Sequence, residues 1–240
     1  MAYENGEWVL RGLPDGDPAC IRTPEALLDY VDEVGFLPLF RGEIPGLSVE
    51  EHTAVSGWWS DDPAEDPWLW RAILAESGRV AYGKFFDKKA GFVSLAWFPR
   101  FANLRRDGYD FDARWDEALA PRREELVMRH FTGGEERFSF ELRQLAGFGR
   151  GGERNFEGTL ASLQMQTYLV MRAFRCRRNK AGMEYGWPIA VYATPESIWG
   201  YDAVTAAYGE DPAESRRRMF EHLRRVCPAA ETKQIERLLR

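Results

Sequence analysis

Five basic side chains lie within nine residues of one another, and no acidic residue stands among them. They are Arg172, Arg175, Arg177, Arg178 and Lys180. Gly182 follows them at the position expected to close a tight hairpin turn. Guanidinium groups on such a hairpin can bind phosphates or enter a minor groove, and each phosphate contact adds salt-dependent affinity. The alternative interpretation is a solvated hairpin tip that binds nothing.

A second group of nucleic-acid-binding candidates stands at the start of a predicted helix. Arg150, Arg154 and Asn155 can donate hydrogen bonds to phosphates or bases there. A recognition helix enters the groove with its N-terminal end, so this position suits DNA contacts. Glu153 and Glu157 lie beside these residues and would repel phosphate, which counts against the interpretation.

Both groups belong to residues 121–194, which carry the pattern of a winged helix. We predict helices at residues 122–131, 139–145 and 155–163, then strands at residues 167–176 and 187–193. Ser139 and Asn155 suit N-caps, and Leu142 and Leu145 are expected to point inward. Three helices followed by a basic hairpin indicate a helix-turn-helix with a wing, and therefore a nucleic-acid partner.

The preceding residues predict a mixed helix and β-hairpin unit. Thr23-Pro24 and Asp66-Pro67 each place a capping side chain before a proline, which is the signal for a helix start. Gly35 and Gly78 are the matching stop signals. The residues expected on the core side of the second helix are Trp70, Ile73 and Leu74. We expect strands at residues 80–86 and 92–97, a break at 98–101 and a charged connector at 105–112.

The predicted class is α+β, with a central winged helix fused to the N-terminal unit and closed by C-terminal helices. The expected parts are an N-terminal arm (1–22), the mixed unit (23–120), the winged helix (121–194) and C-terminal helices (195–240). Tyr109, Phe111 and Trp115 follow the start of the connector, whereas a flexible linker would be poor in aromatic residues. We therefore expect residues 23–240 to form one fused unit.

Charge is distributed unevenly along the chain. The net charge of the whole sequence is −6. Residues 1–120 carry 12 basic and 22 acidic side chains, a balance of −10, whereas residues 121–181 carry 12 and 7, a balance of +5. A basic module between more acidic parts fits a local binding site for nucleic acid. Ordinary scatter of charge is the alternative.

Several other classes of function find no support in the sequence. The three cysteines and three histidines lack metal-ligand spacing, and no nucleotide-binding or nucleophile motif occurs, so we expect no metal and no cofactor. No signal peptide and no apolar run of membrane-spanning length occurs, so we expect a cytoplasmic protein without a membrane partner.

An acidic, tryptophan-rich segment at residues 58–71 allows two interpretations. Its acids could hold a metal or act as an acid–base pair, but aspartate before proline more often starts a turn or helix. Its tryptophans could line a pocket for a flat ligand or an extruded base, but more often form core. The residues concerned are Asp61, Asp62, Glu65, Asp66, Trp58, Trp59, Trp68 and Trp70.

Several phrases resemble the AlkZ-related family of small bacterial proteins. They are Asp66-Pro67-Trp68 with Arg71, AYGKFF at 81–86 with KAGF at 89–92, RRDGYDFD at 105–112, and NKAG at 179–182 with YGW at 185–187. The resemblance covers about residues 25–200. It implies a distant relation to the AlkZ/YcaQ winged-helix DNA glycosylases, which excise alkylated or crosslinked bases.

The resemblance also directs attention to Gln164-Met165-Gln166. The glycosylases use two polar side chains separated by one residue to position water at the sugar. The two glutamines of this tripeptide have the same spacing. In the glycosylases the motif lies near the N-terminus, whereas here it ends the third predicted helix. Residues two apart on a helix point to nearly opposite sides, so the alternative is that Gln164 is a solvated helix residue and Gln166 a residue at the helix end.

Three functions remain open at this point. The first is a duplex DNA-binding protein without catalysis, and the second is a DNA glycosylase that uses Gln164 and Gln166. The third is a non-catalytic module that binds protein through its winged helix. A continuous positive surface from the third helix to the hairpin would favour the first two.

Overall fold

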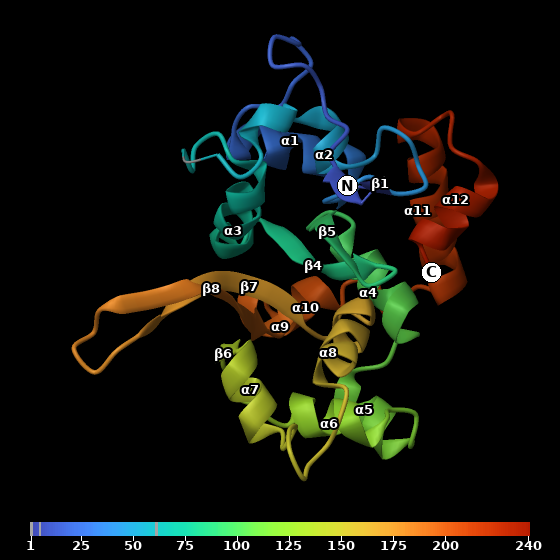
Figure 1. Ribbon diagram of the computed structural model, residues 1–240. Coiled ribbons are helices and arrows are strands. Elements are labelled where there is room, and N and C mark those ends of the chain that lie inside the picture. Colours follow the sequence, from blue (N-terminus) through green and yellow to red (C-terminus); the bar gives the residue numbers. More distant parts are fainter. Residues whose placement is uncertain (1, 5, 61) are drawn as a thin grey trace.

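The computed structural model describes residues 2–4, 6–60 and 62–240 and confirms the α+β class. Two three-stranded antiparallel sheets lie among the helices, with strand orders β3-β5-β4 and β6-β8-β7. In Figure 1 the first sheet lies near the middle of the molecule, and the β7–β8 hairpin projects far from it.

The N-terminal unit follows its predicted start and stop signals closely. Its elements are α1 (Pro24–Val34), β3 (Phe36–Pro38), α2 (Val49–His52), α3 (Pro67–Ser77), β4 (Val80–Phe86) and β5 (Lys89–Ser94). Thr23 and Asp66 cap α1 and α3, and Gly35 and Gly78 end them with positive φ angles. Ile73 is an exception to the predicted core face of α3, because its side chain is 46% exposed.

Residues 1–22, expected as a loose arm, contain strands and hydrogen bonds to the unit. A short hairpin joins β1 (Ala2–Glu4) and β2 (Glu7–Val9), while Met1 and Asn5 lie outside the described residues. Leu13 N donates to Thr53 O at 2.9 Å, and Ile21 N donates to His52 O at 2.7 Å. The end of this segment therefore lies against α2.

The strand ends before residues 98–101, as predicted, but these residues start a helix, and the predicted charged connector at 105–112 is partly helical. Residues 98–106 form a helix, α4 (Phe98–Arg106), and a second short helix follows, α5 (Phe111–Asp116). Pro99 lies in the first turn of α4, where proline is tolerated because that turn has no hydrogen-bonded N–H to lose. Phe98, Phe101 and Arg106 are all buried, so α4 is a core helix.

Residues 121–194 contain the predicted helices and hairpin in the predicted order. They form α6 (Arg122–Met128), β6 (Arg137–Phe138), α7 (Ser139–Leu145), α8 (Phe156–Met165), β7 (Val170–Arg178) and β8 (Glu184–Ala193). The two-residue strand β6 was not predicted, and it pairs with β8.

Details of these helices differ from the predictions. Helix α6 ends at Met128, three residues early, and Phe138 rather than Ser139 occupies the N-cap of α7. Leu145 was expected inside but is 53% exposed. Asn155 does occupy the N-cap of α8, but in a left-handed conformation and without a side-chain capping bond.

The C-terminal helices close the molecule on the side of α4. They are α9 (Pro195–Trp199), α10 (Tyr201–Val204), α11 (Pro212–Val226) and α12 (Thr232–Leu238), and α11 packs on α4. Thr194 and Asp211 cap α9 and α11. No helix in the described part of the chain is both long enough and apolar enough to cross a membrane.

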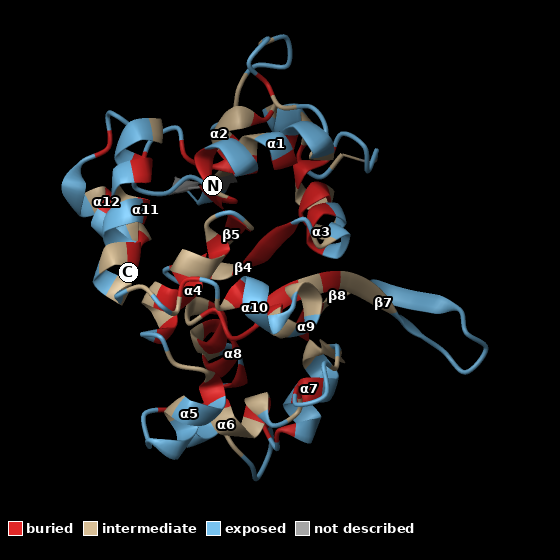
Figure 2. Cartoon of the chain, turned by 180° about the vertical axis from the view of Figure 1, so that it is seen from behind, coloured by how far each residue is buried: buried red, intermediate tan, exposed pale blue. Residues whose placement is uncertain are grey.

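One apolar core runs through all of these parts. Buried side chains of α1, β4, α4, α8 and α11 belong to the same cluster. Figure 2 shows burial concentrated around β4, α4 and α8, whereas the outer part of the hairpin is exposed. The hairpin is therefore attached to the core only at its base.

Candidate nucleic-acid interface

The outer half of the β7–β8 hairpin, which we define as residues 177–188, is exposed along its whole length. Asn179 shapes its tip, because its side-chain oxygen accepts hydrogen bonds from Ala181 N (2.9 Å) and Met183 N (3.0 Å). Gly182 adopts the positive φ of 79° that was predicted for the turn. The turn chemistry thus places the basic run on a projecting hairpin (Figure 1).

The outer half carries three of the predicted basic residues. Arg177 lies over the Phe140 ring, 4.3 Å from its centroid, and Arg178 pairs with Glu184 at 3.1 Å. Lys180 forms no ion pair with any described residue. All three are exposed, so their charges remain available to a polyanion.

The other two predicted basic residues hold the base of the hairpin in place. Arg172 Nη1 donates to Ala75 O (3.0 Å) and Glu76 O (2.6 Å), two carbonyls in the last turn of α3. Arg175 pairs with Glu136 at 2.6 Å and with Glu76 at 3.5 Å. Partial burial opposes the charge of Arg175, but the bond to Glu136 raises its pKa above the usual value. Both arginines are committed to contacts within the fold.

Exposed apolar side chains in the outer half were not predicted. Trp187 is 89% exposed, and Met183 and Tyr185 are also largely exposed. Between the pairs Arg175↔Ile189 and Arg177↔Tyr185, one residue of β7 faces residues 186–188 of β8. Trp187 therefore lies in an irregularity of the ladder, a feature common beside functional sites. Sequence analysis assigned it to a strand and contained no signal for its exposure.

The N-terminal end of α8 forms a second basic patch. Arg150, Arg154 and Asn155 are exposed there, and no described residue forms an ion pair with either arginine. Glu153, which was expected to repel phosphate, instead pairs with Arg123 at 3.0 Å and Arg122 at 3.5 Å. These two arginines at the start of α6 were overlooked, although an Arg-Arg pair at a helix start was visible in the sequence.

The remainder of α8 is buried. Phe156, Leu160, Leu163 and Gln164 are all buried, and the helix packs on β4. Only its first turn and the preceding loop remain open to a large partner. In contrast, most of α7 is exposed beside the hairpin (Figure 2).

The two glutamines of the tripeptide point to different surroundings. Gln164 is fully buried: its Oε1 accepts from Lys84 N and its Nε2 donates to Leu160 O, both at 3.0 Å. Gln166 Nε2 donates to Glu124 Oε1 at 2.8 Å and to Ser162 Oγ at 3.0 Å. The structure therefore does not bring the two amides together.

The tryptophan-rich segment mostly forms core and helix caps. Trp58 and Trp70 are buried, whereas Trp59 is 53% exposed and Trp68 is partly exposed. Asp66 Oδ1 accepts from Trp59 N and Trp68 N as the cap of α3. Asp61 lies outside the described residues, and Asp62 and Glu65 are exposed. Within the described residues, no group of three or more His, Cys, Asp or Glu side chains is placed to hold a metal.

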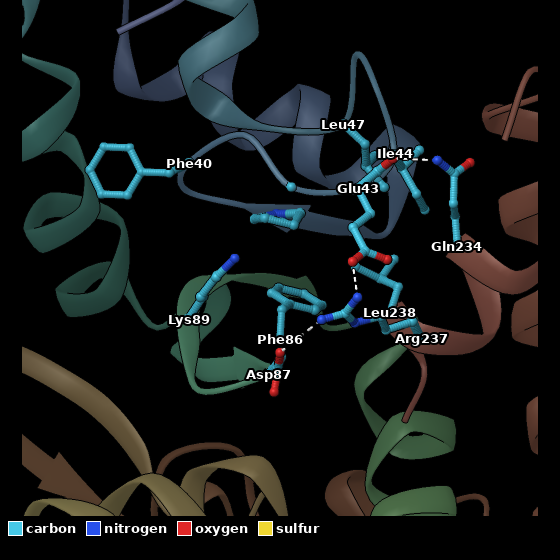
Figure 3. A pocket seen from close by; sticks show the side chains of 12 residues that line it. Phe40, Glu43, Ile44, Leu47, Phe86, Asp87, Lys89, Gln234, Arg237 and Leu238 are labelled. Carbon is cyan, nitrogen blue, oxygen red and sulfur yellow. Dashed lines mark hydrogen bonds and ion pairs between the residues drawn. The ribbon is translucent and has the colours of Figure 1, made fainter. Parts of the chain in front are cut away.

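A small hollow lies between the loop at residues 40–47, the β4–β5 turn and α12 (Figure 3). Its apolar lining includes Phe40, Ile44, Leu47, Phe86 and Leu238. Arg237 at its edge pairs with Glu43 and, at 3.5 Å, with Asp87. Because these charges pair with one another, the hollow presents little that would select a ligand.

Comparisons with known proteins place the chain in a family. No curated protein and no solved structure matches it. Residues 21–240 match the family described as AlkZ related. That match spans nearly the whole chain and includes the hairpin, α8 and the N-terminal unit. The protein therefore belongs to the AlkZ-related family.

Proposed function

We propose that this protein binds duplex DNA through the outer half of the β7–β8 hairpin and the basic patch at the start of α8. One observation carries the proposal: Arg177, Arg178 and Lys180 project on an exposed hairpin together with Trp187. Cations that neutralise phosphates and an aromatic side chain that can contact bases are the two components of groove binding.

The element order supports this use of the hairpin. Three helices followed by a two-stranded hairpin are the element order expected of a winged helix, whose hairpin would contact the DNA backbone or a groove. Burial of α8 means that the helix would approach DNA with its first turn only. The hairpin would therefore contribute most of the contact. A relation to AlkZ-type DNA glycosylases, implied by the resemblance, agrees with a nucleic-acid partner.

We infer a role in binding and not in base excision. Two side chains that hold one water at a sugar must face the substrate together. Gln164 uses both of its polar groups inside the fold, whereas Gln166 contacts Glu124 and Ser162. The pair would need a rearrangement of α8 before it could act on a base.

The proposal is tested by duplex binding at several salt concentrations. Fluorescence anisotropy with a labelled duplex should give weak binding of the wild type that falls steeply with salt. A triple variant with alanine in place of Arg177, Arg178 and Lys180 should bind more weakly. Its slope of log K against log salt should be smaller in magnitude by about two to three.

A matched control removes the same charge elsewhere. Arg216, Lys233 and Arg240 are exposed on the α11–α12 side and form no ion pairs within the described residues. Alanine at these three positions should leave the slope nearly unchanged. Equal losses in both triple variants would mean that net charge, rather than the hairpin, determines binding.

A further inference from the structure

Arg71 on α3 is a buried arginine enclosed by aromatic rings. Its guanidinium carbon lies 3.8 Å from the centroid of the Trp68 ring and 4.1 Å from that of Phe174 on β7. The whole residue is only 8% exposed. Two rings at these distances fix the position of the guanidinium plane. The N–H groups at the edges of this plane are then the groups that can bind a partner.

Those edges have no partner inside the fold. Arg71 Nε and Nη1 are fully buried and form no hydrogen bond, and no described carboxylate pairs with the group. The acid that acts on it through charge, Asp66, uses its Oδ1 to accept the backbone N–H groups of Trp59 and Trp68. Removal of a cation from water without compensation is costly, so an unpartnered buried guanidinium indicates a missing anion.

Arg106 shows that this fold satisfies a buried guanidinium elsewhere. Its nitrogens donate to Thr167, Glu196 and Tyr208 at distances between 2.5 and 3.1 Å. Arg100 and Arg105 also have a buried Nε without a partner, but their other nitrogens form hydrogen bonds, whereas no nitrogen of Arg71 has a hydrogen-bond partner among the described residues.

Tyr82 of β4 packs against the same Phe174 ring as Arg71 and carries a second possible donor. Its ring contacts Phe174, with 6.1 Å between centroids, and its hydroxyl makes no hydrogen bond within the described residues. Burial raises the pKa of Tyr82 to about 12, although the charge of Arg71 acts in the opposite direction. The hydroxyl therefore keeps its proton near neutral pH and can donate it.

We propose that Arg71, together with the Tyr82 hydroxyl, binds the oxyanion of a small ligand, either a phosphate or a carboxylate group. A planar guanidinium with free N–H edges matches both groups, because each presents two oxygens to parallel donors. The third nitrogen, Nη2, has no partner and is not fully buried, so a ligand can reach the group from its side. This site uses none of the hairpin residues assigned to DNA.

The direct test observes the guanidinium itself in the full-length chain. In ¹H–¹⁵N spectra of arginine side chains, the Nε–H resonance of Arg71 is identified by its loss in Arg71→Lys. Titration with sodium phosphate or sodium acetate at constant ionic strength should shift this resonance saturably, and sodium chloride should not. Exposed Arg79, identified through Arg79→Lys, is the matched control on the segment after α3. No saturable shift with either oxyanion, or an equal shift at Arg79, would overturn the proposal.

A second variant tests the proposal even if Arg71→Lys does not fold. Tyr82→Phe removes only a hydroxyl that has no partner in the fold, so the variant should remain folded. Its affinity for the more tightly bound oxyanion should fall about fivefold, the effect of one lost hydrogen bond. Unchanged affinity would exclude Tyr82 from the site. Duplex binding should keep its salt slope in this variant, which separates the oxyanion site from the hairpin.

Discussion

The arginines around α4 and those on the outer hairpin have the same chemistry but opposite surroundings. Arg106 is 1% exposed and forms hydrogen bonds to α9 and to the residues around α8 and α10. Its neighbour Arg105 donates to Phe85 O, Met165 O and Leu238 O, which belong to β4, α8 and α12. Arg177 and Arg178, in contrast, are exposed and contact Phe140 and Glu184, which lie near or on the hairpin.

This difference separates arginines that build the fold from arginines that are available to a partner. On α4, the guanidinium groups of Arg105 and Arg106 join segments far apart in the chain, so the loss of either group should be felt throughout the molecule. On the outer hairpin, the same group contributes little to folding and can serve binding.

The largest effect is expected from Arg106→Ala. Removal of the buried guanidinium leaves Glu196 and Tyr208 without their partner, so the free energy of unfolding should fall by about 3–5 kcal/mol. Urea denaturation followed by circular dichroism measures this change. Arg100→Ala is the control on the same helix, because Arg100 pairs with Glu210 at a partly exposed site and should contribute about 1 kcal/mol or less.

The same experiment tests the prediction that residues 23–240 unfold as one unit. If α4 joins the two halves, the weakened variant should still show a single transition at lower urea. Two transitions would contradict this, as would rapid proteolysis between Arg105 and Arg114 into two cooperatively unfolding fragments. Within that segment, Tyr109 O accepts a hydrogen bond from Tyr168 Oη at 2.9 Å. This bond should help the segment to resist the protease.

A smaller effect is expected from pH at His222. Burial lowers the pKa of His222, and the charge of Arg225 acts in the same direction, while the bond to Val34 O opposes both. Protonation therefore favours the unfolded chain, whose histidine titrates near pH 6.5. Stability from this group should be complete above about pH 6.5 and decrease as the pH falls towards the lower pKa of the folded state.

Melting temperatures between pH 8 and pH 5 measure this effect. His222→Gln keeps a polar side chain beside Trp97 but cannot titrate, so its curve should be flatter than that of the wild type over this range. Parallel curves would assign the loss of stability to carboxylates instead.

The sequence was a reliable guide to the helix starts at which a capping side chain precedes a proline. Thr23 and Asp66 cap helices as predicted, because the capping side chain and the N–H group that donates to it lie only two or three residues apart. The basic hairpin could be found in the same way, from a run of charges and a turn glycine.

Prediction failed wherever a distant partner decides the outcome. Arg106 was assigned to a charged connector, because nothing near it in the chain reveals Glu196 or Thr167. For the same reason, Arg172 and Arg175 could not be distinguished from Arg177, since their partners lie on α3 and at Glu136. Burial of α8 likewise depends on its contact with β4.

The smallest effect on stability is expected from Trp187→Ala. This variant also tests most directly whether residues of the outer hairpin serve binding and not folding. A side chain that is 89% exposed buries little on folding, so the free energy of unfolding should change by less than about 0.5 kcal/mol. If Trp187 contacts bases, duplex affinity should still fall about tenfold, within the range measured for aromatic contacts to bases. The salt slope should remain that of the wild type, because no charge is removed.

Anisotropy titrations at three salt concentrations measure the affinity and the salt slope separately, with Trp59→Ala as the control for another exposed tryptophan. Unchanged affinity in Trp187→Ala would restrict the role of the hairpin to its charges, and a lower melting temperature would place Trp187 among the residues that stabilise the fold.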